Sequence, residues 1–419
     1  MDKVNSTTVD NWLSPLQKHI RNGKVEFITI KVRIFGDDME SDFCAKFDEG
    51  PLTAEKVCNA VAERQGLSEN GKKVFALWII GRDIELQLRP KHNLFQLMEN
   101  WNKWVEKYTH FPEANNPAHP ICKHWFVFRK EALDSTPVSE YEENALTLLY
   151  GEAYQNIQSS RYPCTVEDIV NLSALQLQTH GDYNSIRHTS GYLVEQDRWL
   201  YLVPLKMRKK LSAKTWGKRI LEAYARHVGK SQTAARKRYL EYVRKFPFNG
   251  NSFFPCCQYL PPGAYFEMRQ QHHLFGVGAD GISILDQDKN KLLFHCGWKN
   301  LVWQFNDDNI VMWVLKEGTT INVDEKKKQK YSKQFEIITP QAAIIQNVIE
   351  RAIHLTKKEE TPLNLTYSTR DLKSLNNTTS SLANNRFKEA RLTRMEKARS
   401  YITDIQKVNG ITIIDEDKS

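Results

Sequence analysis

The sequence predicts a multidomain α+β protein in which three lobes of different secondary structure follow one another. The first part of the chain alternates apolar and polar residues as strands do, the middle part repeats apolar residues at helical spacing, and the third part returns to strands before one last helix. A chain of 419 residues that is 41% hydrophobic can form cores for about two to four domains. The expected parts are a flexible leader (1–23), a first lobe (24–134), a helical lobe (135–250), a third lobe (251–358) and a mostly disordered polar tail (359–419).

The first lobe opens with a half-buried strand. In VEFITIKVRIF the apolar residues from Ile28 to Ile34 alternate with threonine, lysine and arginine, so one face is apolar. The elements expected next are a returning strand over 43–47, a helix capped by Thr53 that ends near Gly66, and strands beginning at Val74, Ile84 and His124. Strand, hairpin, helix, strand and strand is the order of a ubiquitin-like β-grasp fold.

The middle of the chain, residues 141–246, is expected to form an all-α bundle. Apolar residues recur at intervals of three and four from Ala145 to Ala153, and again around Trp216 and Tyr239. Thr165, with Asp168 three residues later, predicts the capped start of another helix.

The third lobe is expected to be a seven-strand meander closed by a C-terminal helix, which is a PH- or PTB-like β-sandwich. Thr339 is the expected N-cap of that helix and Pro340 its first residue. The buried stripe is expected at Ile345, Val348, Ile349, Ala352 and Ile353.

The stretch GVGADGISILDQ (276–287) has the glycine spacing of a dinucleotide-binding loop. In that loop the glycines follow a strand and open a helix. Here a β-branched run, a polar turn and another apolar run follow, so the segment predicts hairpins in which Gly276, Gly278 and Gly281 supply positive φ at turns. No cofactor is expected.

The lobe order and several motifs resemble the FERM domain family. GVGADGISILD resembles the third-lobe hairpin of that family, residues 298–305 resemble its spacing of Trp, aliphatic and Phe residues, and residues 239–254 resemble the join between its second and third lobes. The resemblance covers residues 24–357 and implies that the helical lobe is similar to acyl-CoA-binding protein. Residues 74–92, 148–168 and 330–355 are similar to one branch of the family, and GDYNSIRHTSGYL is also similar to its sister group, the Krit branch.

Composition indicates a reducing compartment. The seven cysteines are odd in number and form no C-x-x-C pair, which argues against a disulfide framework and against a zinc ribbon. The N-terminus has no apolar signal segment, and the longest apolar run, residues 74–80, is far shorter than the ~20 residues that span a bilayer. A cytoplasmic protein is expected.

No catalytic residue and no metal ligand are expected. FERM proteins include tyrosine phosphatases, which need a cysteine thiolate and, six residues later, an arginine; here Cys296 follows His295, but Val302 stands in place of the arginine. Kinase motifs are absent from the sequence. The pairs His272-His273 and Cys256-Cys257 lack the spacing of metal ligands.

Positive charge is concentrated in residues 206–245, which hold fourteen Lys and Arg and two Glu, whereas the whole chain has a net charge of +9. One interpretation is a solvated helical face, and the other is a surface for anionic phospholipid. Nucleic acid is not favoured, because no groove-reading module or stacking platform is evident. The candidate lipid-binding residues are Lys206, Arg208, Lys209, Lys210, Lys214, Lys218, Arg219, Arg236, Lys237 and Arg238.

The third lobe offers a candidate peptide site. PTB-like folds bind an extended peptide along the strand beside the C-terminal helix. The expected edge is Leu301, Val302, Trp303, Gln304 and Phe305, with the helix over 341–354 as the second wall. Trp303 and Phe305 are expected to belong to the core, so the backbone edge is the candidate site.

The resemblance implies a non-catalytic adaptor at the inner face of the plasma membrane. Its implied partners are the cytosolic tails of iRhom pseudoproteases, whose complex with a sheddase it would stabilise, and of LRP-type Wnt co-receptors, whose signalling it would dampen. The alternatives are a phosphoinositide-binding membrane module and a Krit-like effector of the small GTPase Rap. Salt would abolish lipid binding, Rap binding would need GTP, and tail binding would need the third-lobe edge.

Overall fold

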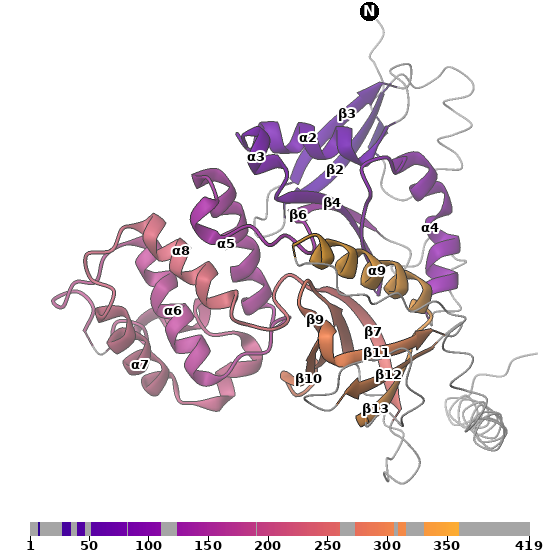
Figure 1. Cartoon of the computed structure of the whole chain (residues 1–419). Coiled ribbons are helices and arrows are strands. Elements are labelled where there is room, and N and C mark those ends of the chain that lie inside the picture. The colour runs from indigo at the N-terminus through magenta and orange to yellow at the C-terminus, as the bar shows by residue number, and fades with distance from the viewer. Residues whose placement is uncertain are drawn as a thin grey trace, which may run out of the picture. The chain divides into compact units, whose positions relative to one another are not determined.

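The computed structural model describes residues 7–8, 27–34, 40–46, 52–81, 83–109, 124–189, 191–259, 273–305, 309–315 and 331–359. All of them belong to one compact unit, Met1–Thr361, and the remaining unit is Pro362–Ser419. Figure 1 shows the described elements in colour. Nearly all of the predicted leader and of the predicted tail lies outside the described residues, except residues 7–8 and Glu359, the last residue of the final helix.

In its described residues the first lobe is a mixed sheet with three helices. Its strand order is β1-β2-β6-β4-β5, and β3 pairs with β2. The elements are β1 (Thr7–Thr8), β2 (Phe27–Ile34), β3 (Glu40–Lys46), α2 (Ala54–Arg64), α3 (Glu69–Lys72), β4 (Phe75–Ile80), β5 (Glu85–Gln87), α4 (Leu94–Tyr108) and β6 (Trp125–Lys130). In β2, Ile30 and Val32 are buried while Lys31 is exposed, so the predicted half-buried strand is confirmed.

Helix α4 occupies residues 94–108, over which no element was predicted. Asn93 caps this helix by accepting a hydrogen bond from the Phe95 amide at 3.0 Å. The buried residues Leu94, Leu97, Trp101 and Val105 lie on one face. Their spacing is visible in the sequence, so this helix could have been predicted from it.

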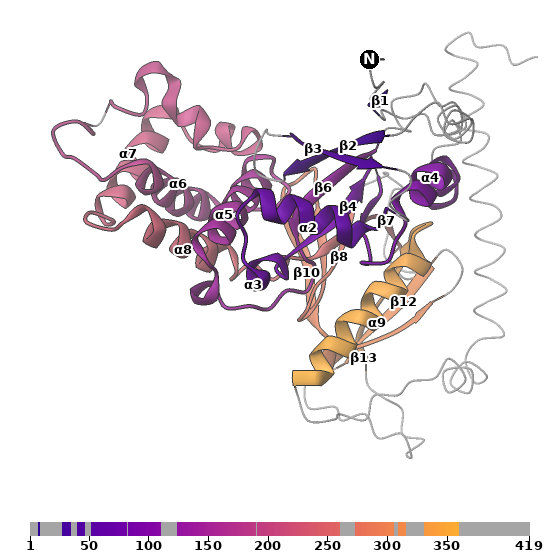
Figure 2. The same ribbon diagram turned by 90° about the horizontal axis from the view of Figure 1, so that it is seen from above.

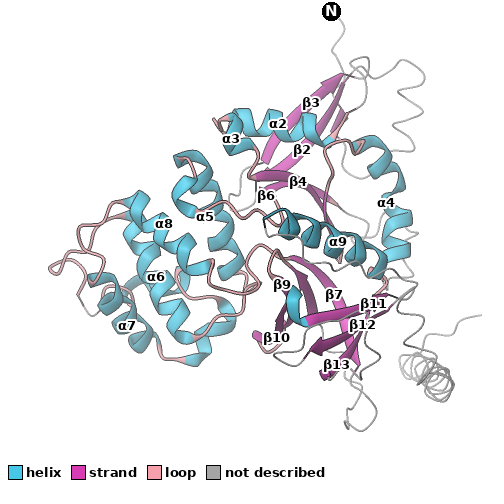
Figure 3. Ribbon diagram, in the orientation of Figure 1, coloured by secondary structure: helices cyan, strands magenta, loops and turns pink. Residues whose placement is uncertain are grey.

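The second lobe is helical, as predicted, and Figure 3 shows helices joined by loops throughout its described residues. Its main helices are α5 (Glu143–Gln158), α6 (Val166–His180), α7 (Ala213–Ala225) and α8 (Gln232–Val243), with short 3-10 helices η4 (Val138–Glu140), η5 (Glu195–Tyr201) and η6 (Leu205–Lys210). Helix α6 packs against both α7 and α8. The predicted capping box is present, since the Thr165 hydroxyl accepts from the Asp168 amide at 3.1 Å and the Asp168 carboxylate accepts from the Thr165 amide at 2.7 Å.

The third lobe is a seven-stranded antiparallel sheet, order β10-β9-β8-β7-β13-β12-β11, with α9 packed on it. Figure 2 shows α9 from above. The strands are β7 (Ser252–Tyr259), β8 (His273–Val277), β9 (Gly281–Asp286), β10 (Lys291–Gly297), β11 (Leu301–Phe305), β12 (Asn309–Leu315) and β13 (Tyr331–Ile338); η7 is Trp298–Asn300 and α9 is Ala342–Glu359.

The predicted start of the last helix is two residues too early. Helix α9 begins at Ala342, and residues 340–341 form a turn. The Thr339 hydroxyl accepts from the Gln341 amide at 3.2 Å and donates to the Pro255 carbonyl at 3.0 Å. The hydroxyl therefore stabilises a turn and anchors it to β7 instead of capping the helix.

The glycine-rich stretch forms the turn between β8 and β9, so the hairpin prediction is confirmed. The predicted reason is correct only for Gly281, which has φ +156°. Gly276 and Gly278 do not have positive φ. A Cβ on Gly276 would lie 2.8 Å from the Asn251 side-chain nitrogen, and one on Gly278 would lie 2.0 Å from its oxygen. These two glycines are needed because the buried Asn251 side chain packs against their backbone.

Candidate functional site

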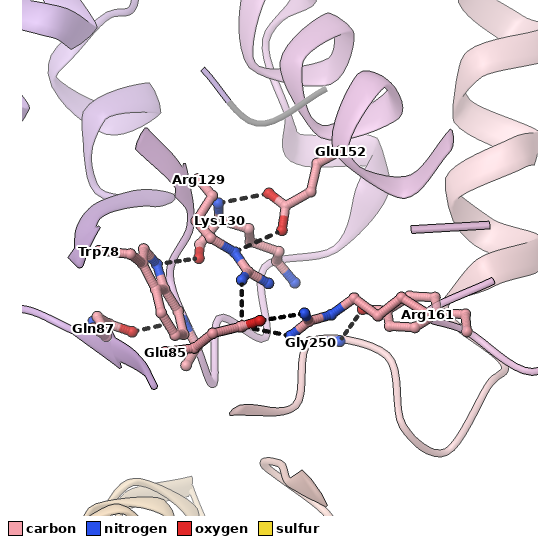
Figure 4. A network of polar contacts seen from close by, with 10 residues as sticks. Trp78, Glu85, Gln87, Arg129, Lys130, Glu152, Arg161 and Gly250 are labelled. Atoms are coloured by element: carbon pink, nitrogen blue, oxygen red, sulfur yellow. Dashed lines mark hydrogen bonds and ion pairs between the residues drawn. The ribbon is translucent and has the colours of Figure 1, made fainter. Parts of the chain in front are cut away.

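A buried polar junction connects the first and second lobes (Figure 4). Glu85, on β5, accepts hydrogen bonds from both terminal nitrogens of Arg161 at 2.5 and 2.6 Å, and from Arg129 on β6 at 3.2 Å. Glu152, on α5, accepts from Arg129 Nε at 3.1 Å and from the Lys130 amide at 2.7 Å. Two carboxylates and two guanidinium groups, contributed by both lobes, therefore form one network.

Aromatic rings line this junction. The Arg129 guanidinium lies 4.4 Å from the ring centre of Trp78, and the Arg161 guanidinium lies 4.9 Å from that of Phe253 in the third lobe. Burial raises the pKa of the Glu85 carboxyl. The positive charges and hydrogen bonds of Arg161, and then of Arg129, lower it by a larger amount, so the pKa lies below its usual value. The carboxylate is thus held in its charged form between the two arginines.

The third lobe is attached to the first by two contacts of α9 and its preceding turn. The Gln341 side-chain amide donates to the Asp83 carbonyl at 2.6 Å. Arg351 forms an ion pair with Glu131. Both contacts join residues far apart in the sequence, and they fix α9, one wall of the predicted peptide site, to the first lobe.

The predicted peptide edge is the last strand of the seven-stranded sheet. In the part of the chain that the structure describes, β11 has one hydrogen-bonded neighbour, β12, in a register that runs from Leu301 opposite Val314 to Phe305 opposite Ile310. Leu301 is buried in the core of the third lobe. Trp303 and Phe305 are partly buried against that core, so they are packed there but retain exposed surface. Helix α9 contacts β11.

Four of the ten residues of the predicted basic surface form ion pairs or hydrogen bonds within the protein. Arg219 pairs with Glu167 at 2.5 Å, and Arg236 pairs with Glu143 at 3.4 Å. Arg208 donates to two carbonyls of its own loop at 3.1 and 2.8 Å, and Lys206 donates to the Gln287 carbonyl in the third lobe. These four side chains have structural partners.

The other six predicted basic residues have different exposures. Lys237 is partly buried, and the remaining five are exposed: Lys209, Lys210, Lys214, Lys218 and Arg238. Lys218 lies 3.9 Å from Glu222, one turn further along α7. The exposed residues are the ones that could meet an anionic surface.

Cys296, the cysteine considered for catalysis, lies in a position that disfavours a reactive thiolate. Cys296 lies on β10, and burial raises the pKa of its thiol, which disfavours the thiolate. Val302 lies on β11, where it forms no phosphate-binding loop. Among the described residues no group of three or more His, Cys, Asp or Glu side chains is placed to hold a metal ion.

No described helix is long and apolar enough to cross a membrane.

Two family models match this chain. The FERM central domain matches residues 136–254, and the C-lobe of the KRIT1/FRMD8 FERM domain matches residues 271–348. These ranges contain the helical lobe and most of the β-rich lobe described above. The resemblance to the FERM family predicted from the sequence is therefore confirmed over these two ranges.

Curated relatives show a similarity to one branch of that family. The chain is similar to FERM domain-containing protein 8 of Xenopus laevis, with 25% identity over 339 residues, 74% of this chain and 72% of the relative. It is 26% identical to FERM domain-containing protein 8 of Homo sapiens over 341 residues, 74% of this chain and 70% of the relative. The similarity expected from residues 74–92, 148–168 and 330–355 was to this branch, and these relatives confirm it.

Solved structures show the same fold. A human Myosin 7b MyTH4-FERM domain, in complex with the harmonin-a PDZ3 domain, has a TM-score of 0.54 at 18% identity, covering 82% of this chain and 66% of that one. The complex of the FERM and C-terminal domains of Drosophila Merlin has a TM-score of 0.52 at 16% identity, covering 79% of this chain and 97% of that one. At these identities the likeness concerns the fold alone.

Proposed function

We propose that this protein is a non-catalytic adaptor at the cytoplasmic face of the plasma membrane, which binds the cytosolic tail of a membrane protein. The tail would lie as an additional strand along β11, beside α9. The observation that carries this proposal is the terminal position of β11 in the sheet, together with its contact to α9. Strand addition at such an edge gives affinity through main-chain hydrogen bonds and specificity through alternate side chains.

The exposed parts of Trp303 and Phe305 would select the peptide. The Trp303 ring meets the Trp298 ring edge-on at 5.8 Å, and the Trp298 indole donates to the Ala279 carbonyl at 2.7 Å. This arrangement orients the aromatic rings at the start of the edge. A peptide with apolar residues at every second position would place them on one face of the added strand.

The resemblance to FERM domain-containing protein 8 supports particular partners. They are the tails of iRhom pseudoproteases, in whose sheddase complex the adaptor would act, and of LRP-type Wnt co-receptors. The two solved relatives support protein binding in general, because the Myosin 7b domain is in complex with a PDZ domain and the Merlin FERM domain with a C-terminal domain. Burial raises the pKa of the Cys296 thiol, which argues against nucleophilic catalysis by this cysteine.

Single prolines introduced in turn at Val302, Trp303, Gln304 and Phe305 test the strand-addition proposal. Backbone N–H groups of a strand alternate between its two sides, so every second proline removes a donor that faces away from β12 and leaves the β11–β12 pairing intact. We expect at least one variant to keep the wild-type melting temperature and to recover no iRhom and no sheddase. The measurement is affinity purification of the tagged protein from its own cells, followed by mass spectrometry.

Prolines at Leu293, Phe294 and His295 are the matched control. They lie on β10, the opposite end of the same sheet. Those β10 proline variants that fold should recover the same proteins as wild type in the affinity purification. Equal recovery by every folded β11 variant contradicts binding along β11, and recovery of Rap alone, dependent on GTP, favours the Krit-like effector.

A further inference from the structure

Two loops meet at the end of the helical lobe where α6 finishes. One is residues 181–189, which follow α6, and the other is residues 226–230, which join α7 to α8. We call these two loops, together with Arg238 of α8, the helical tip. Of its basic residues, Arg238 is among the candidates named from the sequence; Arg226 and Lys230 lie in the basic segment 206–245 but were not named, and Arg187 lies about forty residues before Arg226.

Hydrogen bonds hold the two loops together. The Asp182 carboxylate accepts from the Gly229 amide at 3.1 and 3.0 Å. The Gln178 side-chain amide donates to the Lys230 carbonyl at 2.7 Å and to Asp182 at 3.0 Å, and the Tyr224 hydroxyl donates to the Gly181 carbonyl at 2.7 Å. These hydrogen bonds fix the two loops relative to each other and so hold the backbone that carries the side chains of the tip.

The tip carries an excess of positive charge. Arg187, Arg226 and Arg238 are exposed. Burial, followed by the charge of Lys230 and then of the arginines, lowers the pKa of the His227 imidazole, and burial, followed by the charge of Arg238, lowers that of the Lys230 amine. These groups thus repel one another.

The acidic groups at the tip are fewer than its basic ones. Asp182, which is hydrogen-bonded to the backbone of the turn and to Gln178, offsets one of the four cationic charges, and Glu222, one turn before the end of α7, pairs with Lys218 at 3.9 Å. No ion pair involves Arg187, Arg226, Lys230 or Arg238 among the described residues. An anion that approached this surface would therefore find unneutralised cations.

Two aliphatic side chains project from the same loops. Ile186 is 88% exposed and Val228 is 55% exposed, and each comes from one of the two braced loops. Exposing such residues in water is unfavourable, and transferring them to an apolar phase is favourable by ~25 cal/mol per Å² of apolar surface. Basic side chains around exposed aliphatic ones are typical of surfaces that lie in the headgroup region of an anionic bilayer.

We propose that the helical tip binds the surface of an anionic phospholipid bilayer. Arg187, Arg226, Lys230 and Arg238 would contact the phosphate and carboxylate groups of the lipids, while Ile186 and Val228 enter the boundary between headgroups and acyl chains. This site lies on the helical lobe and is independent of β11, so membrane contact and tail binding can be lost separately.

Sedimentation of the full-length protein with vesicles tests this site. The vesicles contain three parts phosphatidylcholine and one part phosphatidylserine, and vesicles of phosphatidylcholine alone are the comparison. We expect the triple variant Arg187→Gln, Arg226→Gln, Arg238→Gln to bind about a hundredfold more weakly than wild type, since each basic residue near an anionic surface contributes about fivefold. The double variant Ile186→Ser, Val228→Ser should also lose affinity, and it should do so even at low salt.

A matched variant separates the tip from the basic surface predicted from the sequence. Lys209→Gln, Lys210→Gln, Lys214→Gln removes three exposed cations and should change vesicle affinity by less than about fivefold. Leu205→Ser, at a side chain that is 71% exposed, is the control for loss of an exposed aliphatic group. Three results overturn the proposal: no sedimentation of wild type with anionic vesicles, equal sedimentation with neutral ones, or a larger loss in the lysine variant than in the tip variant.

Discussion

Replacing Arg161 with alanine should lower the free energy of unfolding by about 3–5 kcal/mol. The expected loss is large because Arg161 makes two hydrogen bonds to Glu85, at 2.5 and 2.6 Å, and both side chains are largely buried. Without Arg161, the Glu85 carboxylate keeps only the contact with Arg129 at 3.2 Å. Urea denaturation monitored by tryptophan fluorescence measures the change.

The matched control is Arg219→Ala, which removes an arginine–glutamate pair of the same length from a more exposed position. Arg219 and Glu167 are 2.5 Å apart, with side chains 37% and 60% exposed. Because exposed ion pairs contribute little, the expected loss is below about 1 kcal/mol. Similar losses for the two variants would contradict the view that the Glu85 network stabilises the junction between the lobes.

Replacing Gly281 with alanine should destabilise the third lobe by about 3 kcal/mol. A Cβ at this position would lie 2.1 Å from the Cys296 carbonyl oxygen on the neighbouring strand, and φ is +156°, a value that residues with a side chain rarely adopt. To admit the methyl group, the paired strands β9 and β10 must separate at the register position Gly281–Gly297. Thermal unfolding followed by circular dichroism measures the loss.

Gly181→Ala is the control for Gly281→Ala. Gly181 has extended backbone with φ 170°, and no atom lies within 4 Å of the position that its Cβ would take. The expected change is within about 0.5 kcal/mol. If both alanine variants were equally stable, the close approach of β9 and β10 would not be what requires glycine at 281.

Local sequence patterns were sufficient to predict those elements whose structure is determined by residues close together in the sequence. The alternation in β2 and the capping box of α6 depend on residues a few positions apart, and both were predicted correctly. Helix α4 was also specified locally, by apolar residues at helical spacing from Leu94 to Val105, but it was not predicted. The late start of α9 depends on a long-range contact, that between Thr339 and Pro255.

The surroundings of the candidate site residues depend more than the helices and strands do on contacts between residues far apart in the sequence. The requirement for glycine at 276 and 278 comes from Asn251, about 25 residues earlier, so the glycine spacing alone could not reveal it. Likewise, the sequence placed Arg219 and Arg236 in a basic segment with few acidic residues. In the structure each of them is paired with a glutamate more than fifty residues away. The helical tip combines two loops, and no single stretch of sequence contains both Ile186 and Val228.

Hydrogen–deuterium exchange of the full-length protein, with and without a purified cytosolic segment of an iRhom, tests the adaptor proposal most directly. Because an added strand would form hydrogen bonds to the backbone of β11, the proposal predicts that the segment slows exchange at residues 301–305, with a smaller effect in α9. Residues 291–297 of β10 are the internal reference and should exchange at an unchanged rate. Unchanged exchange at 301–305, with slowing elsewhere in the chain, would contradict a peptide site at β11.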